Sequence, residues 1–205
     1  MIVETLTVSP YGTNCYIYAA TTLGQAIVID PGDEGALILR RAEALGVQVA
    51  TIILTHGHPD HTGALGELRA ATGAMVTMHG ADTDLLKDSF LASMLGLRTS
   101  PASLPDRLLE DGQEIGMAGL VFKVLHTPGH SRGSICLLGD GLVFTGDTLF
   151  QTGIGRTDLP GGDYATIVAS IQDKLMVLPD DTKVYPGHGP PTTIGYERVH
   201  NPFLK

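Results

Sequence analysis

The chain has 205 residues, of which 43% are hydrophobic and 17% charged, and its 13 Lys and Arg against 22 Asp and Glu give a net charge of −9. This apolar content excludes a disordered chain, and an acidic chain without a basic cluster is poorly suited to binding nucleic acid. The longest uninterrupted hydrophobic run, Cys15 to Ala20, is far shorter than the roughly 20 residues that cross a bilayer, so we expect no membrane span.

The N-terminal segment MIVETLTVSPYG contains Glu4, no Lys or Arg, and no apolar stretch followed by small residues. Because a secretory signal needs those features, we expect a cytoplasmic protein. The two cysteines, Cys15 and Cys136, lie within apolar strand-like runs. We therefore expect buried thiols there rather than a disulfide or a nucleophile.

Short runs rich in β-branched and aromatic residues predict strands, with helical patterns between them. In chain order, the predicted strands are Ile2–Val8, Cys15–Ala20, Ala26–Asp30, Thr51–Leu54, Val76–His79, Leu120–His126, Ser134–Leu138, Val143–Thr145 and Lys183–Tyr185. The predicted helices are Glu34–Leu45, Thr62–Ala71 and Asp163–Leu178, ending near Gly46, Gly73 and Pro179. Strand-rich blocks followed by helices predict an α/β fold with two stacked sheets flanked by helices. Glycine and proline gather at strand ends rather than in one linker, so we expect a single domain over residues 1–205.

One segment, Ser89–Pro105, is apolar without strand alternation and contains Phe90, Leu91, Met94 and Leu95. Two interpretations stay open. The segment is either a helix and loop that pack on the core, or a flap over a pocket or an oligomer contact.

Four metal-competent side chains fall within the short segment Thr55-His56-Gly57-His58-Pro59-Asp60-His61. It follows a predicted strand and precedes a predicted helix, so its side chains can converge on one point. His56 and His58 can bind one ion, while Asp60 and His61 are displaced towards a second position. This density predicts a metal site, because packing alone has no use for such a sequence.

Three more candidate ligands lie at the ends of predicted strands: His130, Asp147 and His188. Each has a glycine beside it, which lets the backbone turn sharply and lets an ion approach. Taken with the histidine cluster, these residues predict a metal centre built from several strand ends.

The pattern His56-x-His58-x-Asp60-His61, followed by His130, Asp147 and His188, resembles that of the metallo-β-lactamase superfamily over nearly the whole chain. Within it, the motifs Thr127-Pro128-Gly129-His130-Ser131, Gly155-Arg156-Thr157-Asp158 and Asn201-Pro202-Phe203 are most similar to glyoxalase II, the hydroxyacylglutathione hydrolases. The resemblance implies an αββα sandwich of two mixed β-sheets flanked by helices, with a two-metal site at one edge.

Carried over by position, the resemblance implies that His56, His58 and His130 hold a first metal. Asp60, His61 and His188 would hold a second metal, and Asp147 would bridge the two metals. The two ions are expected to be Zn, with Fe or Mn as alternatives. A hydroxide bridging them would attack a thioester of the S-lactoylglutathione type. Asp60 has a second interpretation as a catalytic base if only the first position is filled.

The main alternative function is a persulfide dioxygenase, which resembles the same framework but uses a single Fe(II) held by two histidines and a carboxylate, here His56, His130 and Asp147. A β-lactamase or lactonase is less favoured, because the secreted lactamases usually carry a signal peptide. The partner we expect is a small-molecule thioester, while the sequence does not predict the oligomeric state.

The chain ends 17 residues after His188, without the C-terminal helical extension that holds glutathione in longer glyoxalase II enzymes. Arg156 is the best remaining cation for a substrate carboxylate, although a salt bridge to Asp158 is an equal possibility. Asp30 is a candidate for orienting a ligating imidazole or for an Asx turn. Three histidines are expected outside the ligand set: His79 and His126 as packed or supporting residues, and His200 at the surface.

Overall fold

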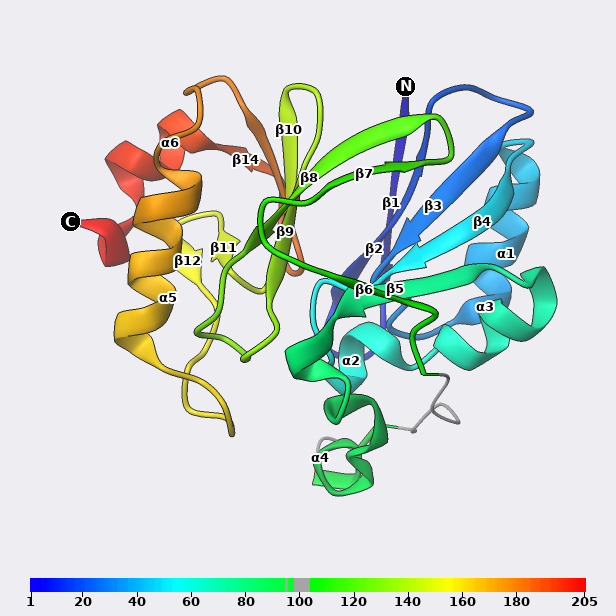
Figure 1. Cartoon of the computed structure of the whole chain (residues 1–205), viewed down its shortest axis with the longest axis horizontal. Coiled ribbons are helices and arrows are strands. Elements are labelled where there is room, and N and C mark those ends of the chain that lie inside the picture. Colours follow the sequence, from blue (N-terminus) through cyan, green and yellow to red (C-terminus); the bar gives the residue numbers. More distant parts are fainter. Residues whose placement is uncertain (95, 98–103) are drawn as a thin grey trace.

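The computed structural model describes residues 1–94, 96–97 and 104–205 (Figure 1). Within that part, the first sheet has six strands in the order β1-β2-β3-β4-β5-β6, antiparallel up to β3 and parallel from there on. The strands are β1 (Ile2–Val8), β2 (Thr13–Ala19), β3 (Gln25–Ile29), β4 (Gln48–Ile53), β5 (Met75–His79) and β6 (Arg107–Leu109).

The second sheet, again counting only described residues, has six strands in the order β14-β13-β10-β9-β8-β7. The pair β10 and β13 is parallel and the other pairs are antiparallel. Its strands are β7 (Glu114–Met117), β8 (Leu120–His126), β9 (Ile135–Leu138), β10 (Leu142–Gly146), β13 (Lys183–Pro186) and β14 (Thr192–Thr193), and a small hairpin is formed by β11 (Leu149–Phe150) and β12 (Gly153–Ile154).

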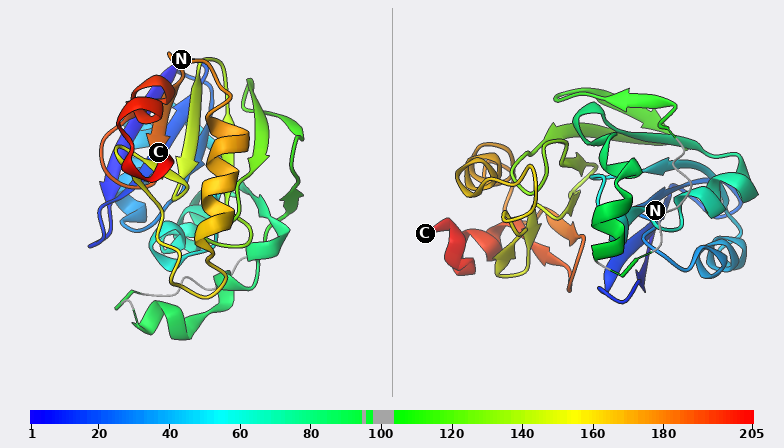
Figure 2. Two further views of the ribbon diagram at one scale, coloured as in Figure 1. Left: turned by 90° about the vertical axis from the view of Figure 1, so that its left-hand side faces the viewer. Right: turned by 90° about the horizontal axis from the view of Figure 1, so that it is seen from below.

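The helices lie outside the two sheets, and Figure 2 shows the layers from two further sides. The α-helices are α1 (Gly35–Ala44), α2 (Pro59–Thr62), α3 (Leu65–Thr72), α4 (Ser89–Met94), α5 (Tyr164–Ser170) and α6 (Ile194–His200). Shorter turns are η1 (Gly80–Asp82), η2 (Leu85–Lys87), the π-helical turn η3 (Ile171–Leu175) and η4 (Pro202–Leu204).

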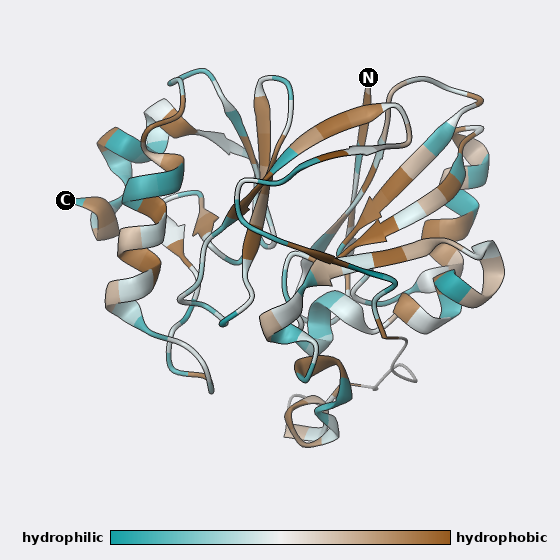
Figure 3. Cartoon of the chain, in the orientation of Figure 1, coloured by the Kyte–Doolittle hydropathy of each residue, from teal (hydrophilic) through white to brown (hydrophobic). Residues whose placement is uncertain are grey.

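Three apolar clusters hold these layers together, and in Figure 3 the strands of both sheets are largely brown while the outer helices carry both brown and teal residues. One cluster joins α1 and α3 to the first sheet, a second lies between the sheets, and a third joins α5 to the second sheet. Strand β2 shows how one sequence serves two clusters, because Cys15 and Ile17 face the helices while Tyr16 and Tyr18 face the other sheet. Alternation with period two therefore makes β2 buried on both faces.

The predicted α/β fold with two mixed sheets flanked by helices is confirmed, and each of the nine predicted strands is present with small shifts at its ends. Two predicted helices differ in extent. The segment Thr62–Ala71 is the end of α2 followed by α3, and Asp163–Leu178 is α-helical only to Ser170 before it continues as η3. Six strands or helices were missed, namely β6, β7, β11, β12, β14 and α6.

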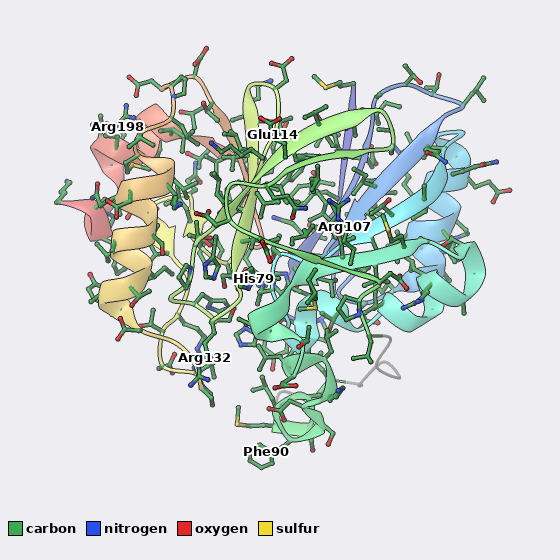
Figure 4. All side chains as sticks on the ribbon, in the orientation of Figure 1. His79, Phe90, Arg107, Glu114, Arg132 and Arg198 are labelled. Carbon is green, nitrogen blue, oxygen red and sulfur yellow. The ribbon has the colours of Figure 1, made fainter. Side chains whose placement is uncertain are left out.

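The segment 89–105 begins with α4, and its residues 95 and 98–103, Leu95 included, lie outside the described residues. On α4, Leu91 is buried while Phe90 is 78% exposed and Met94 56% exposed. Figure 4 shows Phe90 at the far end of α4, directed away from the sheets. No helix of the described chain is long and apolar enough to cross a bilayer.

Candidate metal centre

The predicted ligands follow the carboxyl ends of strands that meet at one edge of the two sheets. In the first sheet, the loop after β4 carries the histidine cluster. In the second sheet β8, β10 and β13 run in the same direction, and the loops that follow them carry His130, Asp147 and His188. Ligand-binding residues gather at such edges because loops there are free to present side chains.

A first group of histidines is formed by His56, His58 and His130, all buried, whose ligand atoms lie within 4.8 Å of one another. His58 Nδ1 lies 2.8 Å from His130 Nε2, and the His56 ring lies 4.8 Å from each of the other two rings. These side chains come from both sheets, so the folded core brings them together.

A second group is formed by Asp60, His61 and His188, whose ligand atoms also lie within 4.8 Å of one another. His61 Nε2 lies 3.3 Å from His188 Nε2, and His188 Nε2 lies 3.3 Å from Asp60 Oδ2. The carboxylate of Asp147 lies between the groups, with Oδ1 3.3 Å from His61 Nε2 and Oδ2 3.5 Å from both His130 and His188 Nε2. All seven predicted ligands are therefore at one place.

Buried polar atoms that make no hydrogen bond indicate whether this site suits a metal. Among the described residues, His56 Nε2, His58 Nε2 and Asp147 Oδ1 are buried and make no hydrogen bond. Leaving such atoms unsatisfied is costly, and imidazole nitrogen and carboxylate oxygen are ligands that divalent transition metals accept. The donor set therefore fits divalent metal ions.

The two groups differ in their protonation. Burial holds the pKa of His56 well below its ordinary value and lowers that of His58 to about 3, so both rings are neutral and able to bind a metal. Burial opposes charge in the second group as well, but the neighbouring carboxylates outweigh it and raise the pKa of His188 to about 9. The same carboxylates raise the pKa of His61. The imidazoles of His61 and His188 in turn lower the pKa of Asp60 to about 2, against the effect of its burial. Without metal, the second group is thus a network of ion pairs.

Asp30 orients the second group, as one of its two sequence interpretations proposed. It is 1% exposed, and its carboxylate accepts hydrogen bonds from Thr55 N at 2.7 Å and Thr55 Oγ1 at 2.6 Å. Its Oδ2 also lies 3.0 Å from His61 Nδ1, which leaves Nε2 of that ring directed towards the second group. A carboxylate behind a ligating imidazole fixes its tautomer and orientation.

The loop that carries His188 is held by two residues the sequence analysis did not single out. The Asn14 side chain donates to Pro186 O at 3.0 Å and to Gly189 O at 2.8 Å, and Tyr16 OH donates to Pro186 O at 2.6 Å. Both come from β2 in the opposite sheet. Neither position carries a signal in the sequence, because these contacts join residues about 170 positions apart.

A cavity of about 310 Å³ opens onto the two groups. Its lining residues are Tyr11, His58, Asp60, His130, Asp147, Phe150, Ile154, Arg156, Leu159 and His188. No described residue of the segment 89–105 contributes to it, so the flap interpretation gains no support from the described part. The lining combines the apolar side chains of Phe150, Ile154 and Leu159 with polar groups, as is usual for small-molecule sites.

Arg156 contributes to the site twice. Its backbone carbonyl lies 2.8 Å from His130 Nδ1 and orients that ring. Its guanidinium makes two hydrogen bonds of 2.6 to 2.7 Å with Asp158, and both side chains are more than half exposed. The salt bridge to Asp158 is therefore formed, at the rim of the cavity.

The remaining histidines and cysteines lie away from the two groups. His79 and His126 stack on each other with ring centroids 4.1 Å apart, and His200 lies against Tyr196 on α6. Cys15 and Cys136 are free and buried, and burial raises the pKa of both thiols. His79 and His126 thus agree with the packed interpretation, His200 is exposed as expected, and the thiols are buried as expected.

The chain is similar to known proteins over its whole length. The profile described as the metallo-beta-lactamase superfamily matches residues 8–188. Hydroxyacylglutathione hydrolase GloC from Haemophilus influenzae is 41% identical over 214 residues, which span 100% of this chain and 98% of that protein. The solved structure of the BLEG-1 B3 metallo-beta-lactamase is similar with a TM-score of 0.94 and 36% identity, covering 100% of both chains. TTHA1623, solved in a di-iron-bound form, has a TM-score of 0.90 and 40% identity over 98% of this chain and 100% of its own.

Proposed function

The chain belongs to the metallo-β-lactamase superfamily, whose members bind divalent metals, and from this premise we propose that it is a binuclear metallohydrolase that cleaves thioesters of the S-lactoylglutathione type. The observation that supports the proposal best is the pair of three-ligand groups joined by Asp147. A family relative with 41% identity over the full length is a hydroxyacylglutathione hydrolase.

In this proposal His56, His58 and His130 would hold one ion, Asp60, His61 and His188 would hold the other, and Asp147 would serve as a ligand between the two groups. Two divalent ions at such a site supply hydroxide at neutral pH and stabilise the negative charge that develops on a carbonyl oxygen. We assign zinc as the metal. Iron is the first alternative, since the relative TTHA1623 has been solved with two irons, and manganese is the second.

The residues of the chain orient the metals and the substrate. Asp147 and Asp60 keep low pKa values next to the imidazoles of the second group, so both are ionised and able to serve as ligands. Should only the first group be filled, Asp60 would stand at the cavity as an ionised base. A thiolate is a weakly basic leaving group, so the chain need not supply a general acid.

The lining of the cavity suits both an acyl group and a charged substrate tail. Phe150, Ile154 and Leu159 supply apolar surface in the cavity that the ligands also line. Arg156 lines the same cavity and keeps its guanidinium at the rim. An exposed ion pair such as that with Asp158 contributes little, so a substrate carboxylate can compete for the guanidinium. We propose Arg156 as the substrate-binding cation.

A persulfide dioxygenase with a single Fe(II) is the second candidate. Its ligand set of His56, His130 and Asp147 is also at hand, with His130 Nε2 3.5 Å from Asp147 Oδ2. That function would leave the second group without a role, although its members lie as close together as those of the first. We therefore favour the binuclear hydrolase.

Metal content and activity assays decide between these functions. The protein, prepared without a His tag, is analysed for metal per chain and assayed for hydrolysis of S-D-lactoylglutathione, for oxygen uptake with glutathione persulfide, and for hydrolysis of nitrocefin and a homoserine lactone. About two ions per chain with thioester turnover support the proposal. One iron with oxygen uptake would replace it by the dioxygenase, and hydrolysis of nitrocefin or a homoserine lactone alone would point to a ring-opening enzyme.

A further inference from the structure

A third buried carboxylate, Asp82, joins the two loops that carry the first group. It ends η1 after β5, is 1% exposed, and lies outside the ligand set. Its Oδ2 accepts hydrogen bonds from Gly57 N at 3.1 Å and Ser131 Oγ at 2.6 Å, and its Oδ1 accepts one from Gly133 N at 2.6 Å. No cation pairs with it among the described residues.

The donors to Asp82 are the chain neighbours of the first group. Gly57 lies between His56 and His58, and Ser131 directly follows His130. The first two histidines belong to a loop of the first sheet and the third to a loop of the second. One carboxylate therefore fixes the backbone of all three first-group residues relative to one another across the space between the sheets.

Two glycines allow this close approach. A Cβ on Gly57 would lie 2.7 Å from the carbonyl oxygen of Asp82, and a Cβ on Gly133 would lie 2.7 Å from its backbone nitrogen. Real side chains do not pack at such distances, so these positions need glycine for contact with Asp82. Each loop thus has a glycine, without a side chain, at the position that faces Asp82.

Asp82 is itself held in place from both sheets. His79 Nδ1 accepts a hydrogen bond from Ala81 N at 3.2 Å and so fixes the start of η1. His79 also stacks on His126, which ends β8, with ring planes 12° apart. Figure 4 shows His79 in the middle of the molecule, where the two sheets meet. The stack gives η1 a fixed position relative to the loop after β8.

We infer that Asp82 is a positioning residue that sets the geometry of the first metal site and not of the second; this inference rests on the proposed function. A carboxylate is needed because the three groups that meet it are two N–H donors and one O–H donor. An amide in its place would set an NH₂ group against one of those donors. Behind the second site lies Asp30, whose Oδ2 is 3.0 Å from His61 Nδ1. Asp30 also reaches the first group, because its partner Thr55 Oγ1 lies 3.1 Å from His56 Nδ1.

The test measures Zn²⁺ affinity by competition with a chromophoric chelator in variants that keep one site each. In the His188→Ala background, which keeps the first group, Asp82→Asn is expected to weaken Zn²⁺ binding about 10- to 100-fold, the range seen when a residue behind a ligand is lost. In the His58→Ala background, which keeps the second group, the same change leaves affinity within about threefold.

Asp30→Asn is the matched control, because it also removes a buried carboxylate beside a ligand loop. It is expected to weaken Zn²⁺ binding in the His58→Ala background, where Asp82→Asn does not, because Asp30 contacts His61 directly. Ser131→Ala is a milder variant should Asp82→Asn fail to fold, since it removes one donor and keeps the carboxylate. It should weaken the first site in the same direction by a smaller factor.

Equal weakening of both sites by Asp82→Asn would overturn the inference, because it would indicate a general structural role. Unchanged affinity in both backgrounds would overturn it as well. In either case, the proposed function is not contradicted if the wild-type protein binds two Zn²⁺ ions. A wild-type protein that binds no Zn²⁺, Fe²⁺ or Mn²⁺ would contradict both the inference and the proposed function.

Discussion

Asp147 lies close to residues of both groups of predicted ligands. One of its oxygens lies near His61 and the other near His130 and His188. Its backbone carbonyl packs against Gly155, which has no room for a Cβ atom, and Gly187 packs against its side chain in the same way. The surrounding backbone therefore fixes this carboxylate tightly.

We expect Asp147→Ala to remove at least one metal ion and to lower kcat/KM by more than about 100-fold, since losing a ligand costs more than losing a residue behind one. Asp60→Ala is expected to spare the first group and to leave about one ion per chain. Elemental analysis and thioester kinetics measure both effects. Two ions and full turnover in Asp147→Ala would show that the ligands are assigned wrongly.

The proposed binding of a substrate carboxylate by Arg156 can be tested by substitution. Arg156→Gln removes the guanidinium but keeps the backbone carbonyl that orients His130. We expect KM for S-D-lactoylglutathione to rise about 10-fold or more, which corresponds to losing a hydrogen bond to a charged group, with metal content unchanged. Asp158→Asn is the control, because it frees the guanidinium and should leave KM equal or lower. A fall in kcat without a change in KM would exclude this binding role.

The predicted ligand residues stand out in the sequence because their types and their order are unusual together. Histidine at 56, 58 and 61 with Asp60 has no packing explanation, and the structure brings His130, Asp147 and His188 to the same place. Asp82 and Asn14 were not predictable. Each is a single polar residue whose partners are decided by how the two sheets pack, and spacing along the chain does not encode that.

Among the secondary structure elements, α5 contacts the turn that carries the predicted ligand His130. Its N-cap residue Asp163 donates its backbone N–H to Gly129 O at 2.8 Å, and Ser170 Oγ donates to Pro128 O at 2.7 Å. A Cβ on Gly129 would collide with the backbone of Ile167. The helix thus packs tightly against the turn that carries His130.

Gly129→Ala is expected to displace either α5 or this turn. The residue has a φ of 129°, where glycine is favoured, so strain and overpacking together should lower the free energy of unfolding by about 3 kcal/mol or more. Metal content should fall with it. Gly112→Ala is the control: its φ is 73° with no atom near the added Cβ, so we expect a loss of about 1 kcal/mol with metal retained. Chemical denaturation measures both, and equal losses would show that contact with α5 is unimportant.

The strands with strong alternation were predicted from the sequence, and the weak elements were not. Strand β8 matches its prediction at both ends, because its apolar residues face the other sheet at every second position. Strands β11, β12 and β14 have two residues each, which is too short for a periodic signal. The change from α to π geometry after Ser170 was missed because apolar spacing does not distinguish the two.

At the scale of the whole molecule, the metal centre joins the two sheets. His56 and His58 follow a strand of the first sheet, whereas His130 and His188 follow strands of the second. A metal bound only by the folded state stabilises it by mass action, about 4 kcal/mol when its concentration is 1,000 times its dissociation constant. For a chain of this length, we expect chelation to lower Tm by roughly 10 °C.

The size of this Tm difference should depend on pH, with a sign set by the second group. Without metal, the pKa of His188 is raised to about 9 and that of His61 is raised as well. The ion pairs of these histidines therefore stabilise the metal-free fold fully below their ordinary pKa of about 6.5, and the contribution is lost as pH rises towards 9. A metal must also displace these protons, so its affinity increases over the same interval.

Both effects act in one direction, so we expect the Tm difference between zinc-loaded and metal-free protein to be larger at pH 8.5 than at pH 6.0. His188→Ala keeps the first group, in which burial holds the pKa of His56 and His58 low and leaves no proton to displace. Its Tm difference should be nearly the same at both pH values. Differential scanning calorimetry of the two proteins, with and without zinc, measures this contrast. A wild-type difference that does not change with pH would mean that zinc binds without displacing protons, which a second group built from Asp60, His61 and His188 does not allow.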